Sequence, residues 1–202
     1  MKFTIILFLI INISSLIPQW QKIESPKGNI ECLEYLEYNG QFYAINSNYE
    51  IVLLNKYQTA SKIESNLSNL LEEHKQHYWV QITDFVEYNN MFFLCSTSGL
   101  FSSNDQGKTW KHLAGLDHKP VDYLKHINDK YCAMVGSSLF ISENLNEWYK
   151  PLENNVNSIA SSNSTIYGII NENFVKFDNI DFSYDSLYNI KKGLGLKYEI
   201  SG

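Results

Sequence analysis

Hydrophobic and polar residues alternate along most of the chain in short runs, and polar turn residues separate the runs. The same succession of run, turn and run recurs in residues 33–44, 83–94, 121–132 and 156–167. The turns hold short polar residues, namely Asn39-Gly40, Asn89-Asn90, Asn128-Asp129 and Asn163-Ser164. Such residues tolerate the positive φ of a tight hairpin. The pattern therefore predicts a β-hairpin that is repeated along the chain.

Each repeat continues beyond its hairpin. A third short apolar run follows in residues 99–102 and 138–141, and Trp110 and Trp148 come after a second turn. Trp20, Trp79 and Phe182 stand at the equivalent points of the other repeats. The resulting repeat of about forty residues matches the four-stranded unit of a propeller. We predict an all-β fold, a β-propeller of about four blades, in which each blade covers a face of its neighbour.

One segment, residues 56–78, interrupts the repeat. Within it Ile63, Leu67, Leu70 and Leu71 fall at helical spacing. We therefore expect a short amphipathic helix, inserted between the first and second repeats.

The N-terminus has the pattern of a secretory signal peptide. Lys2 precedes an apolar run over residues 4–11, and this run is too short to span a bilayer. We predict a signal peptide over residues 1–17, one propeller domain over residues 18–202, and a soluble protein in the secretory lumen or outside the cell. The formal net charge of −6 and the lack of a basic stripe argue against a nucleic-acid partner.

Two kinds of side chain bear on this compartment. Asn66 and Asn163 begin N-glycosylation sequons. Cys32, Cys95 and Cys132 are too few for a disulfide framework. All three lie in apolar, strand-like surroundings, so we expect them to be buried as small hydrophobic residues.

One turn carries a motif that is specific for a fold. Residues 103–110 match the pattern S-x-D-x-G-x-T-W at every specified position, with Ser103, Asp105, Gly107, Thr109 and Trp110. Here the chain resembles the Asp-box (BNR, sialidase-type) repeat family of β-propellers. We expect Asp105 to accept backbone N–H groups, Gly107 to supply a permissive φ, and Trp110 to enter the core.

A second, weaker copy of the motif follows at residues 142–148. It keeps Ser142 and Trp148, is one residue shorter, and has Asn144 and Asn146 where the pattern has Asp and Gly. We expect this turn to be looser. The resemblance extends through the repeats over most of residues 20–182, and it implies that the Asp-boxes are structural turns at the blade periphery, away from the ligand face.

The resemblance leaves function open, because the family includes sialidases, other glycosidases, receptor ectodomains and photosystem assembly factors. Sialidases of this family hold the substrate carboxylate with three arginines, whose bidentate geometry lysine does not reproduce. All 16 basic residues of this chain are lysine. Sialidase activity is therefore not expected, and we find no P-loop, nucleophile elbow, HExxH or dinucleotide-binding pattern.

The repeat alignment brings four polar residues to one position, at the start of the first strand of each repeat. They are Glu34, Asp84, Asp122 and Asn157, and the aromatic residues Tyr35, Phe85 and Tyr123 follow three of them. In a propeller this strand lines the central axis, so the oxygens are expected to ring one mouth of the channel and to bind a cation such as calcium, or a sugar. The alternative is that they are solvated or capping residues at the strand entrances.

The sequence therefore favours a secreted, non-catalytic binding module for a glycan or an extracellular protein, without a resident cofactor or metal. The alternative is a small two-carboxylate glycoside hydrolase that uses the same acids. An inert remnant of a larger propeller protein is a third interpretation. Four blades lie at the low end for radial closure, so closure by one chain, closure by dimerisation and a truncated ring all remain open.

Overall fold

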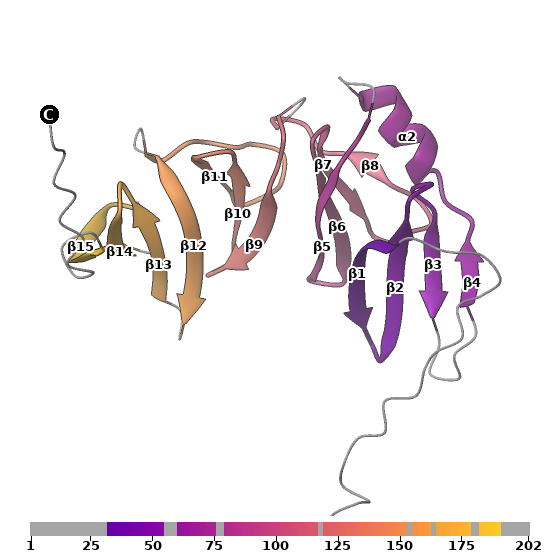
Figure 1. The fold of residues 1–202 in the computed structure, drawn as a ribbon, viewed down its shortest axis with the longest axis horizontal. Helices are drawn as coiled ribbons and strands as arrows, with labels where there is room; N and C mark the ends of the chain where they lie inside the picture. The colour runs from indigo at the N-terminus through magenta and orange to yellow at the C-terminus, as the bar shows by residue number, and fades with distance from the viewer. Residues whose placement is uncertain are drawn as a thin grey trace, which may run out of the picture.

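The computed structural model describes residues 32–54, 60–75, 79–116, 119–152, 155–162, 165–178 and 182–190. These residues form four antiparallel sheets and one helix. The sheets stand side by side in chain order (Figure 1). The prediction of an all-β fold with one short helix is confirmed. The predicted signal peptide, residues 1–17, lies outside the described residues.

Within each sheet the strands follow one another in chain order. The first sheet contains β1 (Cys32–Tyr38), β2 (Gln41–Asn46), β3 (Ile51–Leu54) and β4 (Ala60–Ile63). The second contains β5 (Ile82–Tyr88), β6 (Met91–Ser96), β7 (Gly99–Ser103) and β8 (Lys111–His112). The third contains β9 (Tyr123–Ile127), β10 (Lys130–Val135) and β11 (Ser138–Ser142), and the fourth β12 (Val156–Ser162), β13 (Thr165–Ile170), β14 (Asn173–Phe177) and β15 (Tyr184–Asn189).

The first two strands of each sheet are the hairpins that the sequence predicts. Their turns have positive φ at Asn39, Asn89, Asn90, Asn128 and Asp129, which explains the preference for short polar residues there. The third sheet has only three strands, and its edge continues as a single bridge between Ile141 and Tyr149.

The helix, α2, spans Leu67–His74 and packs with Leu67 and Leu71 in the core. It is shorter than the segment in which the sequence predicts an insertion. Residues 60–63 of that segment form β4, the fourth strand of the first sheet, so Ile63 belongs to a strand and not to the helix. Helical and strand spacing overlap for so short a run, and the pairing of Ile63 with Ile51 on β3 decides between them.

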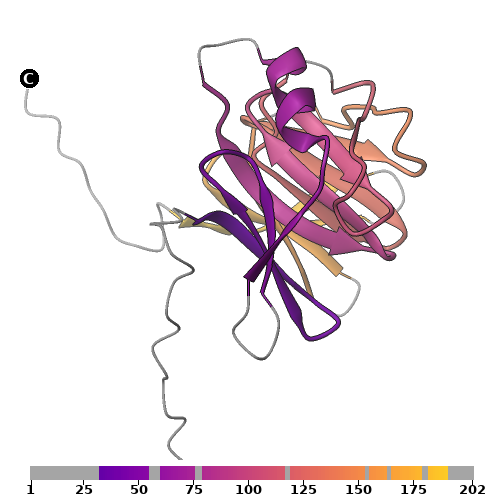
Figure 2. The ribbon, with the colours of Figure 1, turned by 90° about the vertical axis from the view of Figure 1, so that its right-hand side faces the viewer.

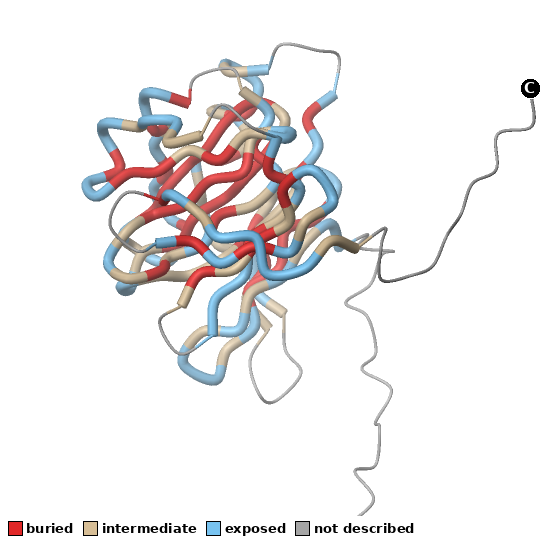
Figure 3. The backbone as a smooth tube through the Cα atoms, turned by 90° about the vertical axis from the view of Figure 1, so that its left-hand side faces the viewer, coloured by how far each residue is buried: buried red, intermediate tan, exposed pale blue. Residues whose placement is uncertain are grey.

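The core lies in three layers, each between two consecutive sheets. Figure 3 shows the buried segments concentrated in the strands. Trp110 and Phe182 are buried in these layers, as their places in the repeat predict. Trp79 differs, because 63% of its surface is exposed; the structure thus contradicts its equivalence to Trp110.

The four sheets form an open row. The first and last sheets lie at opposite ends of it (Figure 1), and Figure 2 looks along the row from the side of the first sheet. Contacts between sheets join each one to the next along the chain. The described residues therefore do not form a closed ring.

Candidate functional site

The predicted polar residues lie along the same edge of the row, one on or beside the first strand of each sheet. Strands β1, β5, β9 and β12 are the first strands of the four sheets and run in a common direction (Figure 1), with β1 beside β5 and β5 beside β9. We call the edge where these strands begin the rim, and define it by Glu34, Asp84, Asp122 and Asn157. Because the row is open, these residues follow one another along an edge and do not encircle a closed mouth as the sequence predicts.

The hairpin register corrects the predicted equivalence. Glu34 pairs with Ile45 and Asp84 with Cys95, each five residues away from its turn. In the third and fourth sheets this position belongs to Tyr123, which pairs with Met134, and to Ser158, which pairs with Ile169. Asp122 and Asn157 come one residue earlier. A bulge accommodates Asn157 between Val156 and Ser158, and the same bulge holds Leu33 and Thr83 in the first two sheets. Asn157 is therefore equivalent to Leu33 and Thr83, and an alignment that does not superimpose the turns misses this.

The charge of Asp84 on the second sheet acts on Glu34 on the first sheet. Burial raises the pKa of Glu34, and the nearby charge of Asp84 raises it further, against a hydrogen bond from the Tyr35 backbone. Burial also raises the pKa of Asp84, although the Leu124 N–H and the charge of Lys125 oppose the change. The two carboxylates thus concentrate negative charge at one point of the rim.

Asp84 also has a structural contact. Its Oδ2 accepts the backbone N–H of Leu124 at 3.2 Å, and Tyr123 does the same for the next pair of sheets, since its hydroxyl accepts the N–H of Ile159 at 2.9 Å. Leu124 and Ile159 hold equivalent places in β9 and β12, one residue after Tyr123 and Ser158. The repeat position thus carries a polar group that satisfies the N–H of the following sheet. The sequence alignment missed this role. An alignment that superimposed the hairpin turns of the four repeats could have revealed it.

Replacement of Asp84 distinguishes its charge from its hydrogen bond. Asp84→Ala is expected to lower the free energy of unfolding by about 1–3 kcal/mol, because it leaves the Leu124 N–H without its acceptor. Asp84→Asn keeps an acceptor oxygen and is expected to unfold at least as late in urea as the wild type at neutral pH. A similar loss in both variants would contradict the assigned hydrogen bond.

The raised pKa of Asp84 also sets a pH dependence. The folded protein binds this proton more tightly than the unfolded chain, so the contribution of Asp84 to stability is most favourable when the carboxyl is protonated and declines as the pH rises through the raised pKa. Asp84→Asn should remove that decline in urea titrations between about pH 4 and pH 7.

The three predicted aromatic residues have different surroundings. Phe85 is buried between the first two sheets, with its ring 5.8 Å from that of Phe92, so the structure contradicts its prediction as a ligand contact. Tyr123 is half-buried, with the Lys125 ammonium 5.8 Å from its ring centre. Tyr35 is 66% exposed, but it lies on the outer face of the first sheet.

Asp122 and Asn157 are both exposed. The charge of Asp122 is felt at Cys95, as is that of Asp84. The described contacts join neither Asp122 nor Asn157 to Glu34. Among the four predicted residues, the described electrostatic effect is that of Asp84 on the pKa of Glu34.

The Asp-box has the local geometry that its motif predicts. The Thr109 N–H donates to Asp105 Oδ1 at 2.8 Å, and the Ser103 hydroxyl donates to the same atom at 2.8 Å. Burial alone would raise the pKa of Asp105, but these hydrogen bonds outweigh it and lower the pKa. Gly107 has a φ of +88°, and Trp110 Nε1 donates to its carbonyl at 2.9 Å.

The second copy lacks the last of these bonds. Asn144 Oδ1 accepts the N–H groups of Asn146 and Glu147 at 2.9 and 3.1 Å, so asparagine replaces the acid. The buried Nε1 of Trp148 has no hydrogen-bond partner among the described residues. The shorter turn therefore makes fewer hydrogen bonds to its tryptophan, which agrees with the looser turn that the sequence predicts.

Asn66 has a contact that the sequence does not reveal. Its Oδ1 accepts the Trp110 N–H at 2.7 Å, and its Nδ2 donates to the Trp110 carbonyl at 3.0 Å. The residue before α2 is thereby fastened to the Asp-box of the next sheet. A glycan at this sequon would be attached to the same Nδ2. The other sequon residue, Asn163, lies outside the described residues.

The cysteines follow the prediction in part. Cys95 and Cys132 are buried, and burial raises the pKa of both thiols, that of Cys132 to about 12. Cys32 is exposed, because it begins the outermost sheet. All three thiols are free, so none is joined in a disulfide.

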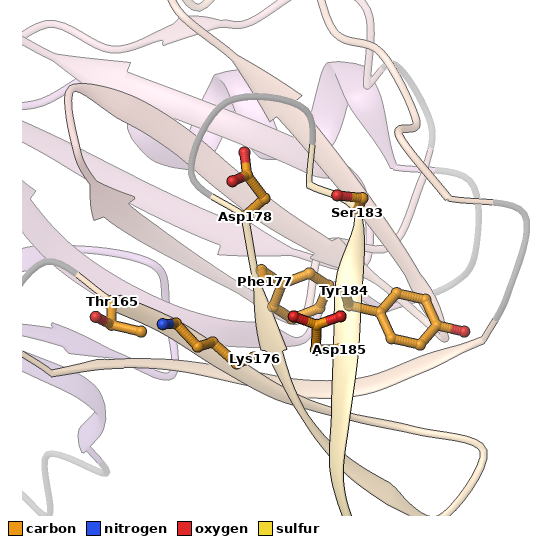
Figure 4. A pocket seen from close by; sticks show the side chains of 7 residues that line it. All are labelled: Thr165, Lys176, Phe177, Asp178, Ser183, Tyr184 and Asp185. Carbon is orange, nitrogen blue, oxygen red and sulfur yellow. The ribbon is translucent and has the colours of Figure 1, made fainter.

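A polar hollow of about 490 Å³ lies in the fourth sheet (Figure 4), and none of the rim residues lines it. Its lining includes Lys176, Asp178 and Asp185, and Lys176 stands opposite Asp185 in the strand register. No three His, Cys, Asp or Glu side chains of the described residues converge as a metal site requires. Across the same residues, no helix has the length and apolar character needed to cross a membrane.

A comparison with protein-family models finds no match, and a comparison with curated protein sequences finds none either. Solved structures do resemble the fold. PorZ, a bacterial surface component of the type-IX secretion system of Porphyromonas gingivalis, is similar with 13% identity and a TM-score of 0.59 over 78% of this chain and 22% of PorZ.

Two further structures have a similar arrangement. YCF48 bound to D1 peptide has 11% identity and a TM-score of 0.58 over 84% of this chain and 57% of that chain. The WD40 β-propeller domain of Doa1 has 11% identity and a TM-score of 0.53 over 84% of this chain and 56% of that chain. This chain thus spans between 22% and 57% of the three. The likeness shows a propeller-like arrangement of sheets.

Proposed function

We propose that this chain is a secreted, non-catalytic binding module of the Asp-box propeller type, in which the four sheets are blades and the rim contacts an extracellular protein or a glycan. The observation that carries the proposal is the pair formed by Glu34 and Asp84. The charge of Asp84 on the second sheet raises the pKa of Glu34 on the first, and each acid is partly withdrawn from water.

Two neighbouring carboxylates favour a ligand that brings positive charge. Of the two ligand classes, an extracellular protein with exposed lysine or arginine side chains meets this requirement directly. A glycan can donate hydrogen bonds from its hydroxyl groups directly to the carboxylates, or it can bind through a calcium ion, because hard cations take oxygen ligands. The net charge of −6 would steer either cation toward the protein.

The likeness to PorZ, a bacterial surface component, and to YCF48, which was solved with a bound peptide, supports a binding role for this fold outside catalysis. The predicted signal peptide over residues 1–17 supports secretion. The complete Asp-box at residues 103–110 supports the proposed family, since its hydrogen bonds are those that the motif implies.

A second candidate is a small glycoside hydrolase. The observation in its favour is the raised pKa of both Glu34 and Asp84, because a general acid must keep its proton near the working pH. The hydrogen bond from the Leu124 N–H to Asp84 Oδ2 stabilises the ionised carboxylate and lowers its pKa, which disfavours Asp84 as a general acid.

The test uses the secreted protein and three probes: an oligolysine peptide, calcium ions alone, and a printed glycan array with and without calcium. Glu34→Gln and Asp84→Asn are each expected to weaken binding of the oligolysine or calcium probe about tenfold, which corresponds to about 1.4 kcal/mol. Glu37→Gln is the control, since it removes an exposed acid from the same strand β1.

The outcomes separate the candidates. Binding that depends on Glu34 and Asp84, without hydrolysis of fluorogenic glycosides, supports the binding module. Hydrolysis that both substitutions abolish supports the glycoside hydrolase. If Glu37→Gln, Glu34→Gln and Asp84→Asn bind the probes equally well, the result contradicts a site at the rim. If the wild type binds none of the three probes, the result contradicts the proposed ligand chemistry.

A further inference from the structure

Each sheet has two faces, and the repeat gives each face a fixed role. The leading face packs against the preceding sheet, as Phe85 and Phe92 of the second sheet pack on the first. The trailing face packs against the following sheet, as Phe93 and Cys95 pack on the third. The same leading-to-trailing contact occurs at all three junctions between the four sheets.

Among the described residues, no sheet lies before the leading face of the first sheet. The strand register makes Tyr35 equivalent to Phe85, and Phe42 equivalent to Phe92. In the other three sheets the residues at these positions are all buried: Phe85, Leu124 and Ile159 at the first, and Phe92, Tyr131 and Ile166 at the second. In the first sheet Tyr35 is 66% exposed and Phe42 is 43% exposed. Large apolar side chains thus occupy core positions and face outward.

Within the part of the chain that the structure describes, no sheet lies after the trailing face of the fourth sheet. Phe174 is equivalent to residues that are fully buried in the other sheets, Ile51, Leu100 and Leu139. Phe174 itself is 40% exposed. Its ring stacks on that of Tyr167 with 5.6 Å between the ring centres, and Tyr188, its partner across the strands, is also exposed. An aromatic surface therefore ends the row.

We propose that these two faces bind a second copy of the chain. The leading face of the first sheet in one copy packs on the trailing face of the fourth sheet in the other, and the twofold axis repeats the contact. The three internal junctions show that trailing faces of this chain accept its leading faces. Two such contacts leave no open face, so the assembly closes into a ring.

The extent of the likeness to known propellers agrees with this closure. The row corresponds to 57% of YCF48 and 56% of the Doa1 propeller domain, so it represents about half of such a fold. Two copies supply eight sheets in place of four, and propellers typically have 4–8 blades. The inference does not depend on the ligand of the rim.

The test measures the mass of the full secreted chain by sedimentation and by light scattering. The wild type is expected to have twice the monomer mass. Tyr35→Glu and Phe174→Glu are each expected to give monomers, because both contacts of the ring contain the altered face. Tyr149→Glu is the matched control, since Tyr149 is a 46% exposed aromatic residue of the third sheet, and this variant should remain a dimer.

Mixing the two variants tests the orientation of the contact. Tyr35→Glu retains an intact trailing face and Phe174→Glu an intact leading face, so a mixture forms one wild-type contact and should regain dimers. A wild type that is monomeric at all concentrations would overturn the proposal. So would an open polymer, a mixture that stays monomeric, or dissociation by Tyr149→Glu. Far-UV circular dichroism verifies that each variant is folded. If Tyr35→Glu does not fold, Tyr35→Ser is measured in its place and is expected to be a monomer.

Discussion

Replacement of Trp110 with alanine is expected to lower the free energy of unfolding by about 3–5 kcal/mol, as for other buried aromatic residues. Trp110 is buried between the first and second sheets, with its ring 6.2 Å from that of Phe85. Its indole N–H donates to Gly107, and its backbone is held by Asn66. Removal of the side chain leaves a cavity and one unpaired carbonyl. Urea unfolding followed by circular dichroism measures the loss.

The matched control is Trp79→Ala. This tryptophan is exposed, so the substitution is expected to change stability by no more than about 0.5 kcal/mol. If Trp110→Ala does not fold, Trp110→Phe retains most of the packing and is expected to fold with a smaller loss. Equal effects at positions 79 and 110 would contradict the burial of Trp110 and the assignment of the Asp-box to the core.

Gly107→Ala is the second substitution with a large expected effect, a loss of about 2–4 kcal/mol in the free energy of unfolding. Two causes act together. The φ of +88° is unfavourable for a residue with a Cβ, and the added Cβ would lie 2.8 Å from Ile51 Cδ1 of the first sheet. The Asp-box turn thus packs directly against the neighbouring sheet, and any side chain at position 107 disturbs both the turn and that sheet.

Gly40→Ala separates the two causes. Gly40 also has a positive φ, of +71°, but nothing lies within 4 Å of an added Cβ, so the expected loss is about 1–2 kcal/mol. Ile51→Val removes the atom that clashes, and it should restore part of the stability when combined with Gly107→Ala. If Gly40→Ala and Gly107→Ala have the same effect, or if Ile51→Val gives no recovery, the contact between Gly107 and Ile51 does not contribute.

The sequence predicted the local features of the Asp-box because each is set by neighbouring residues. Asp105, Gly107 and Trp110 make the contacts that their types and spacing require. The contact of Asn66 with Trp110 was not predictable in this way, since 44 residues separate the two. Only the packing of α2 against the second sheet brings them together.

At the rim, in contrast, the sequence predicted less than the tertiary structure decided. The sequence placed Glu34 and Asp84 in one set with Asp122 and Asn157, and within this set the charge of Asp84 raises the pKa of Glu34. It misplaced Asp122 and Asn157 by one residue, because the aligned segments did not superimpose the turns that set the hairpin register. It also expected Phe85 to face a ligand, whereas the side chain points between the sheets.

By itself the sequence determined the repeated hairpins, the all-β class, the helix near Leu67 and Leu71, and the complete Asp-box, because periodicity and turn chemistry act over a few residues. The tertiary structure alone decided which polar residue of each repeat meets the next sheet, which aromatic residues are buried, and that the row of four sheets stays open. Those outcomes depend on contacts between sheets, which join residues far apart in the sequence.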